Sequence, residues 1–99
     1  MYIINTTYAV SGSLTEEWKK WASEVLFPSI IRTEILTDPK MYRVMIESEN
    51  DDKSFCVQYS TEIEGVRLWK KVLEAATQKL VKDKFGMSVI GFSTILKSV

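Results

Sequence analysis

The sequence predicts a single α+β domain, residues 1–99, whose elements follow the order β-α-β-β-α-β. Two alternating apolar runs flank a polar turn near the middle of the chain, which predicts a β-hairpin. An apolar stripe at helical spacing lies on each side of that hairpin, and one further strand pattern lies near each end of the chain. With 99 residues and 45% apolar content, the chain is long enough to bury one modest core.

The first strand and the first helix come from the N-terminal third of the chain. Residues 2–10 are β-branched and aromatic, with apolar residues at both parities, which is typical of a central strand. Ser13 and Glu16 have capping-box spacing, so we expect a helix to begin at Leu14. Pro28 lacks a backbone N–H, so we expect a kink or restart there. The apolar stripe of this helix is Leu14, Trp18, Trp21, Ala22 and Val25, and the tryptophans are interpreted as packing residues.

The hairpin spans residues 41–61 and follows a turn predicted at Thr37-Asp38-Pro39-Lys40. Its own turn is a two-residue loop, Asn50-Asp51, or a four-residue loop, Glu49 to Asp52, and both give the same pairing. Its alternation predicts one face against the helices and one half-polar face. The pairs predicted on the helix face are Ile46 with Phe55, Val44 with Val57, and Tyr42 with Tyr59. The pairs predicted on the opposite face are Met45 with Cys56 and Arg43 with Gln58.

The second helix and the last strand complete the order of elements. Thr61 and Glu64 repeat the capping-box spacing, and apolar residues then recur at helical spacing as far as Leu80. Gly86 stands where a left-handed C-cap residue belongs, so the helix is expected to end near Phe85. Residues 88–96 alternate again and predict the fourth strand.

This order is that of the ferredoxin-like fold, a four-stranded antiparallel sheet with two helices on one face. The other sheet face would then be bare, yet Met41, Met45, Cys56 and residues of the terminal strands are too apolar to leave in water. We therefore expect a homodimer formed through the open sheet face.

Composition excludes several classes of function. Thirteen basic and thirteen acidic residues cancel, so no nucleic-acid partner is expected. The chain has no histidine and one cysteine, so we expect no metal and no cofactor. No apolar run spans a bilayer and residues 1–4 lack a signal-peptide pattern, so we expect no membrane partner and a soluble, cytoplasmic protein.

Several motifs resemble a known family of short bacterial proteins, the domain of unknown function DUF4286. They are Glu16-Glu17-Trp18 with Trp21, Glu24-Val25 and Pro28; Val57-Gln58-Tyr59; and Phe85-Gly86 with Phe92 and Thr94. The resemblance covers nearly the whole chain and implies a ferredoxin-like fold of the dimeric α+β barrel kind. The family pattern has a histidine two places before the helix proline, where this chain has Leu26, so chemistry based on that histidine is not implied here.

Candidate site residues come from the half-polar hairpin face. Arg43, Gln58, Met45 and Cys56 could line a cavity between two sheets, with Arg43 anchoring a carboxylate or carbonyl. Two structural interpretations, in which these residues bind no ligand, compete with this one. Arg43 and Gln58 would form a polar contact at a subunit seam, and Cys56 would be an inert buried thiol. The acidic hairpin tip at residues 47–52 is interpreted as a solvated turn.

Three functions follow from these residues. The first is a homodimeric small-molecule-binding or structural module, which the sequence favours. The second is a cofactor-free enzyme, monooxygenase-like or isomerase-like, that orients an already reactive substrate. The third, an RNA binder, is disfavoured because Cys56 stands where the RNA-recognition motif needs an aromatic residue.

Overall fold

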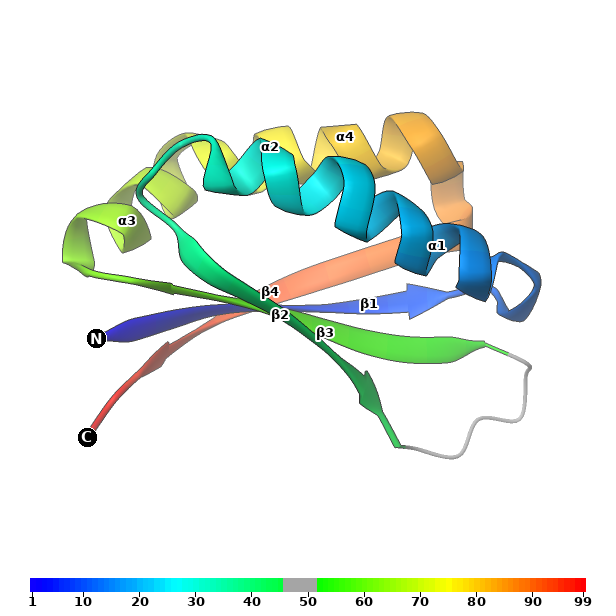
Figure 1. Cartoon of the computed structure of the whole chain (residues 1–99), viewed down its shortest axis with the longest axis horizontal. Coiled ribbons are helices and arrows are strands. Elements are labelled where there is room, and N and C mark those ends of the chain that lie inside the picture. Colours follow the sequence, from blue (N-terminus) through cyan, green and yellow to red (C-terminus); the bar gives the residue numbers. More distant parts are fainter. Residues whose placement is uncertain (46–51) are drawn as a thin grey trace.

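The computed structural model describes residues 1–45 and 52–99 and confirms the predicted order of strands and helices. Both helical segments lie on one side of a single sheet, and no helix among the described residues covers the other side (Figure 1). The sheet is antiparallel throughout, with the strand order β2-β3-β1-β4. Its strands are β1 Tyr2–Val10, β2 Thr37–Val44, β3 Lys53–Thr61 and β4 Val89–Lys97. The first strand is central, as its composition predicts.

The first helical segment changes its hydrogen-bonding pattern just before Pro28. It consists of a 3₁₀ turn, Gly12–Leu14, then α1, Thr15–Trp21, a π-helical turn, Ala22–Leu26, and α2, Phe27–Ile31. The N–H of Phe27 donates to the carbonyl of Ala22, five residues back. A regular α-helix would need an N–H from Pro28 toward Glu24, and a widened turn avoids this requirement. The predicted restart near the proline is therefore confirmed.

The second helical segment contains α3, Ile63–Leu68, a π-helical turn, Trp69–Leu73, and α4, Glu74–Phe85. A 3₁₀ turn, Gly86–Ser88, then leads into β4. Gly86 has φ of 60° and ψ of −135°, a conformation that only glycine adopts without strain, so the predicted helix end is confirmed. Within the described part of the chain, no helix combines the length and the apolar character needed to span a bilayer.

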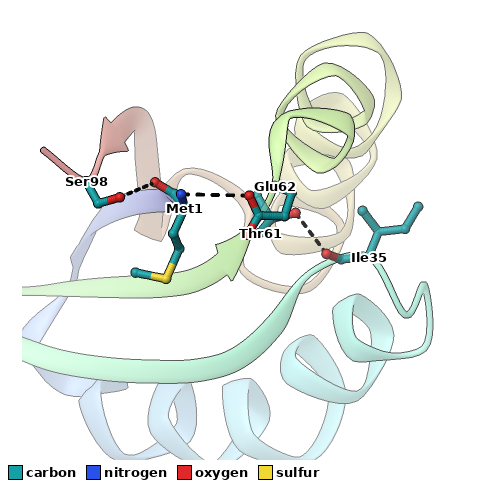
Figure 2. Close-up of polar contacts among 5 residues, drawn as sticks. All are labelled: Met1, Ile35, Thr61, Glu62 and Ser98. Atoms are coloured by element: carbon teal, nitrogen blue, oxygen red, sulfur yellow. Dashed lines mark hydrogen bonds and ion pairs between the residues drawn. The ribbon is translucent and has the colours of Figure 1, made fainter.

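Neither predicted capping box forms. Ser13 lies inside the 3₁₀ turn rather than before a helix, so its hydroxyl makes no cap hydrogen bond. Thr61 is the last residue of β3, and its Oγ1 donates to the carbonyl of Ile35 at 2.9 Å (Figure 2). That hydrogen bond joins the loop before β2 to the start of α3. The neighbouring ends of β1 and β4 are joined by Ser98, whose Oγ donates to the carbonyl of Met1 at 3.0 Å (Figure 2).

The core lies between the helices and the sheet and is rich in aromatic rings. Trp18 is fully buried, with its ring centroid 4.7 Å from that of Tyr8 and 5.8 Å from that of Phe85. Trp69, in the second helix, is 1% exposed. The packing interpretation of these two tryptophans is therefore confirmed. The strands contribute Ile4, Tyr8, Val10, Phe55, Val57, Tyr59 and Val89 to the same core.

The predicted hairpin register is wrong by three residues. Tyr42 pairs with Cys56 rather than Tyr59, and Met41 rather than Val44 pairs with Val57. Because three is odd, the shift exchanges the two faces of β2, which places Met41 against the core and Tyr42 on the uncovered face. The pair predicted between Ile46 and Phe55 lies outside the described residues.

The start of β2 also differs from the prediction. The strand begins at Thr37, inside the segment predicted as a turn, and its pairing with β3 is irregular between Thr37 and Lys40. Asp38, within that irregularity, has a positive φ of 54°. The turn residues therefore produce a local bend at the start of the strand instead of a separate loop.

Candidate functional site

The uncovered sheet face has a polar centre formed by the two central strands. The register places Asn5 opposite Gln58 and Thr7 opposite Cys56. All four side chains are half-buried even though no helix covers them. The Nε2 of Gln58 donates to the Oδ1 of Asn5 at 3.1 Å, which fixes the two amides side by side. The centre of this face therefore presents amides, hydroxyls and a thiol.

Large apolar side chains from the edge strands flank this polar centre. Phe92 of β4 is 65% exposed and pairs across the sheet with Thr7, while Tyr42 of β2 is 50% exposed and pairs with Cys56. Ile90 and Leu96 of β4 lie on the same face and are also exposed. Single exposed apolar residues are ordinary, but a set gathered on one face indicates an interaction surface. We call this surface the open sheet face.

The structure brings together only part of the predicted site. Cys56 and Gln58 lie on the open sheet face, as expected. Arg43 pairs with Phe55 and so lies on the opposite side of the sheet, against the first helix, which separates it from Gln58. The register shift of β2 is the physical reason. Met45 follows the last residue of β2 and is 81% exposed.

Sequence reasoning missed Asn5 and Thr7. The sequence does contain a signal for them. Asn5 and Thr7 stand at odd positions of the strand, whereas the buried Ile4 and Tyr8 stand at even positions, and this alternation indicates that one face of the strand meets water. Placing β1 beside β3 then brings Asn5 to Gln58. Without the strand order, the polar residues on β1 could not be connected with those of the hairpin.

The chemistry available at the centre of this face is hydrogen bonding. The amides of Asn5 and Gln58 retain donors and acceptors beyond their mutual hydrogen bond, and the hydroxyl of Thr7 can both donate and accept. Among residues 1–45 and 52–99, no group of three or more histidine, cysteine, aspartate or glutamate side chains is arranged to hold a metal ion.

Two buried tyrosines lie on the helix side of the sheet, not at this face. Burial raises the pKa of Tyr8 above its ordinary value. The pKa of Tyr59 is raised mainly by burial and further by the nearby Tyr8. Both phenols therefore stay protonated around neutral pH, and they serve the core rather than proton transfer.

The family model for DUF4286, a domain of unknown function, matches residues 1–99. Comparison with curated proteins gives no match.

Solved structures confirm the ferredoxin-like fold. An ethyl tert-butyl ether D (EthD) family protein from Bacillus halodurans has a TM-score of 0.66 at 14% identity, covering 100% of each chain. A dimeric ferredoxin-like protein from an uncultured marine organism has a TM-score of 0.66 at 11% identity, covering 100% of this chain and 95% of that one. A candidate antibiotic biosynthesis monooxygenase from Bacillus cereus has a TM-score of 0.53 at 16% identity, covering 99% and 94%. At these identities the likeness shows a shared fold.

Proposed function

The chain belongs to the DUF4286 family, a domain of unknown function, and we propose that it is a homodimer that binds a small molecule between two open sheet faces. The observation that carries this proposal is the pattern of that face. Exposed apolar residues lie on both edge strands, and a polar strip lies between them.

Two copies related by a two-fold axis would bury the same patch from each chain. Phe92, Ile90, Leu96 and Tyr42 would leave water together, and each large side chain contributes about 1.5–3 kcal/mol when fully buried. A stable interface of this kind buries roughly 1,200–2,000 Å² in total. The dimeric ferredoxin-like neighbour supports the proposal, since a protein of the same fold assembles as a dimer.

Dimerisation through the open sheet face would remove water from the polar centre. Once water is excluded, the unused donors and acceptors of Asn5, Thr7 and Gln58 need partners, because an unsatisfied buried polar group costs about 1–3 kcal/mol. A small polar molecule can supply these partners, and Cys56 would contact it as an apolar neighbour. If the strip pairs directly with its copy, the module is structural and binds nothing there.

The dimer is tested by light scattering on the wild type and on two charge variants. Phe92→Glu puts like charges at the seam and should give a mass near 11.4 kDa, where the wild type gives twice that value. Met87→Glu is the matched control, since Met87 is 73% exposed and lies in the turn before β4 rather than on the open sheet face. A monomeric wild type would contradict the dimer, and a dimeric Phe92→Glu variant would contradict an interface on the open sheet face.

The ligand is tested by native mass spectrometry of the freshly purified protein. We expect dimers with an added small mass, and we expect Gln58→Ala to lose that mass. Gln78→Ala, an exposed helix position, removes the same amide elsewhere and should retain it. A wild-type dimer without added mass would contradict a ligand retained through purification and would support the structural module.

A further inference from the structure

A second concave surface lies on the helix side of the sheet, away from the open sheet face. It is a hollow of about 320 Å³ between the start of the first helical segment and the adjoining ends of β2 and β3. Small-molecule sites in proteins begin at about this volume. Because Arg43 faces this hollow, it cannot serve the site that the sequence predicts with Gln58.

Three cationic side chains from separate elements converge there. Arg43 comes from β2, Lys53 from β3 and Lys19 from α1. The floor is the ring of Phe55, which is 3% exposed, and the ammonium of Lys19 lies 5.9 Å from its centroid. A chain with no net charge has no general excess of cations, so this local group reflects the way the fold arranges its strands and helix.

Among residues 1–45 and 52–99, the lining of the hollow contains fewer acidic than basic side chains. Glu16 is the acidic residue of the lining, and its carboxylate pairs with Lys19 at 3.4 Å. Within residues 1–45 and 52–99, neither Arg43 nor Lys53 has an ion-pair partner. Like charges in a concave surface repel each other, and an anion between them removes this repulsion.

The hydroxyl of Ser13 adds a neutral donor at the same hollow. It makes no cap hydrogen bond, which is why the predicted capping box fails, and its residue lines the hollow beside the cations. Guanidinium, ammonium and hydroxyl donors together are the set that binds carboxylate and phosphate oxygens.

We propose that the hollow bounded by Arg43, Lys53, Lys19 and Ser13 binds the oxyanion group, carboxylate or phosphate, of a small ligand. Arg43 is the anchor, because its planar guanidinium can donate to two oxygens of one oxyanion. Lys53 and Lys19 neutralise the remaining charge, and Phe55 packs against an apolar part of the ligand. This site does not depend on dimerisation, since it is formed within one chain on the other side of the sheet.

The test is a titration with inorganic phosphate and with malonate, followed by amide shifts in two-dimensional NMR. We expect saturable shifts that are largest around Gly12, Ser13, Arg43 and Lys53 for at least one probe. Tighter binding of phosphate would assign the ligand as a phosphate ester, and tighter binding of malonate would assign it as a carboxylate. Raising the salt concentration should weaken the binding, because the site is partly exposed.

Arg43→Gln should weaken binding by on the order of tenfold, the effect of losing one charge-assisted contact. Lys71→Gln is the control, because it removes an exposed cation in the second helical segment, outside the lining of the hollow. Light scattering of the Arg43→Gln variant shows separately whether the oligomer is intact. Shifts that do not saturate, or equal losses from Arg43→Gln and Lys71→Gln, would overturn the proposal.

Discussion

At the scale of single residues, the contact between Tyr8 and β4 depends on a glycine, Gly91, which has no side chain. Gly91 pairs with Tyr8 across the sheet, and a Cβ added at Gly91 would lie 2.6 Å from the Cδ1 of the tyrosine ring. Tyr8 also packs against Trp18 on its helix side, so moving its ring away from Gly91 would disturb that contact. Glycine is required here for the close approach of a ring, not for an unusual backbone conformation.

Gly91→Ala should therefore lower the free energy of unfolding by about 1–3 kcal/mol, the usual cost of overpacking a core. Urea denaturation followed by tryptophan fluorescence measures this change. Lys97→Ala, an exposed position at the end of the same strand, should change stability by less than about 0.5 kcal/mol. Equal stability of Gly91→Ala and the wild type would show that Tyr8 can rotate away.

The same buried tyrosines predict a loss of stability in alkaline solution. The pKa of Tyr59 is raised in the folded state by burial, then by Tyr8, whereas an unfolded tyrosine ionises near pH 10. Below about pH 10 both states keep the proton, so the stabilisation is complete. Above that pH only the unfolded state loses it, and the free energy of unfolding falls by up to about 1.4 kcal/mol per pH unit for each such tyrosine.

Comparison of the wild type with Tyr59→Phe isolates this effect from the titration of lysines. Urea midpoints measured from pH 8 to pH 11 should fall more steeply for the wild type than for the phenylalanine variant. Parallel curves would mean that the Tyr59 hydroxyl ionises at the same pH in the folded and the unfolded protein.

At the scale of elements, the sequence predicts strands better than it predicts their pairing. β1 follows from its residue types, and β4 and the core face of β3 follow from alternation, because helices cover only one side of the sheet. β2 carries apolar residues at both parities, with Met41 on the core side and Tyr42 and Val44 on the other. Alternation alone therefore cannot choose its register.

The candidate site shows the same limit. Cys56 and Gln58 belong to β3, whose faces are correctly predicted, so their place on the open sheet face follows from the sequence. Arg43 belongs to β2, and the register shift moves it to the helix side. Asn5 joins Gln58 only through the order of strands, which depends on contacts between residues more than fifty positions apart.

The junction between β3 and α3 depends on a hydrogen bond that joins distant segments. Thr61 is 6% exposed, and its Oγ1 donates to the carbonyl of Ile35 at 2.9 Å (Figure 2). Thr61→Val keeps the shape of the side chain but leaves that carbonyl without this donor, so we expect a loss of about 1–3 kcal/mol in thermal or urea denaturation. Thr61→Ser, which keeps the hydroxyl donor, is the control and should retain most of the stability. Ser13→Ala should be nearly neutral, because its hydroxyl caps no helix.

At the scale of the whole molecule, the helices cover one face of the sheet, and no other described residues cover the opposite face (Figure 1). The helices cover Ile4, Val57 and the aromatic residues on one side, and they cannot also cover Phe92, Ile90 and Leu96 on the other. Association with a second copy would add a layer without any change in the chain. Folding and association would then be linked, since a face that is stable only when covered contributes to stability only in the dimer.

This linkage predicts a melting temperature that depends on protein concentration. If the unfolded chains are monomeric and the folded protein is a dimer, each tenfold dilution removes about 1.4 kcal/mol of stabilisation per dimer. For a domain of this size that change corresponds to a fall of several degrees in melting temperature. Calorimetry of the wild type over a hundredfold range of concentration measures it.

Phe92→Glu, which should prevent association, should melt at a lower temperature that does not change with dilution, and Met87→Glu should follow the wild type. A wild-type melting temperature that is constant over this range would show that the folded protein is a monomer with an exposed open sheet face.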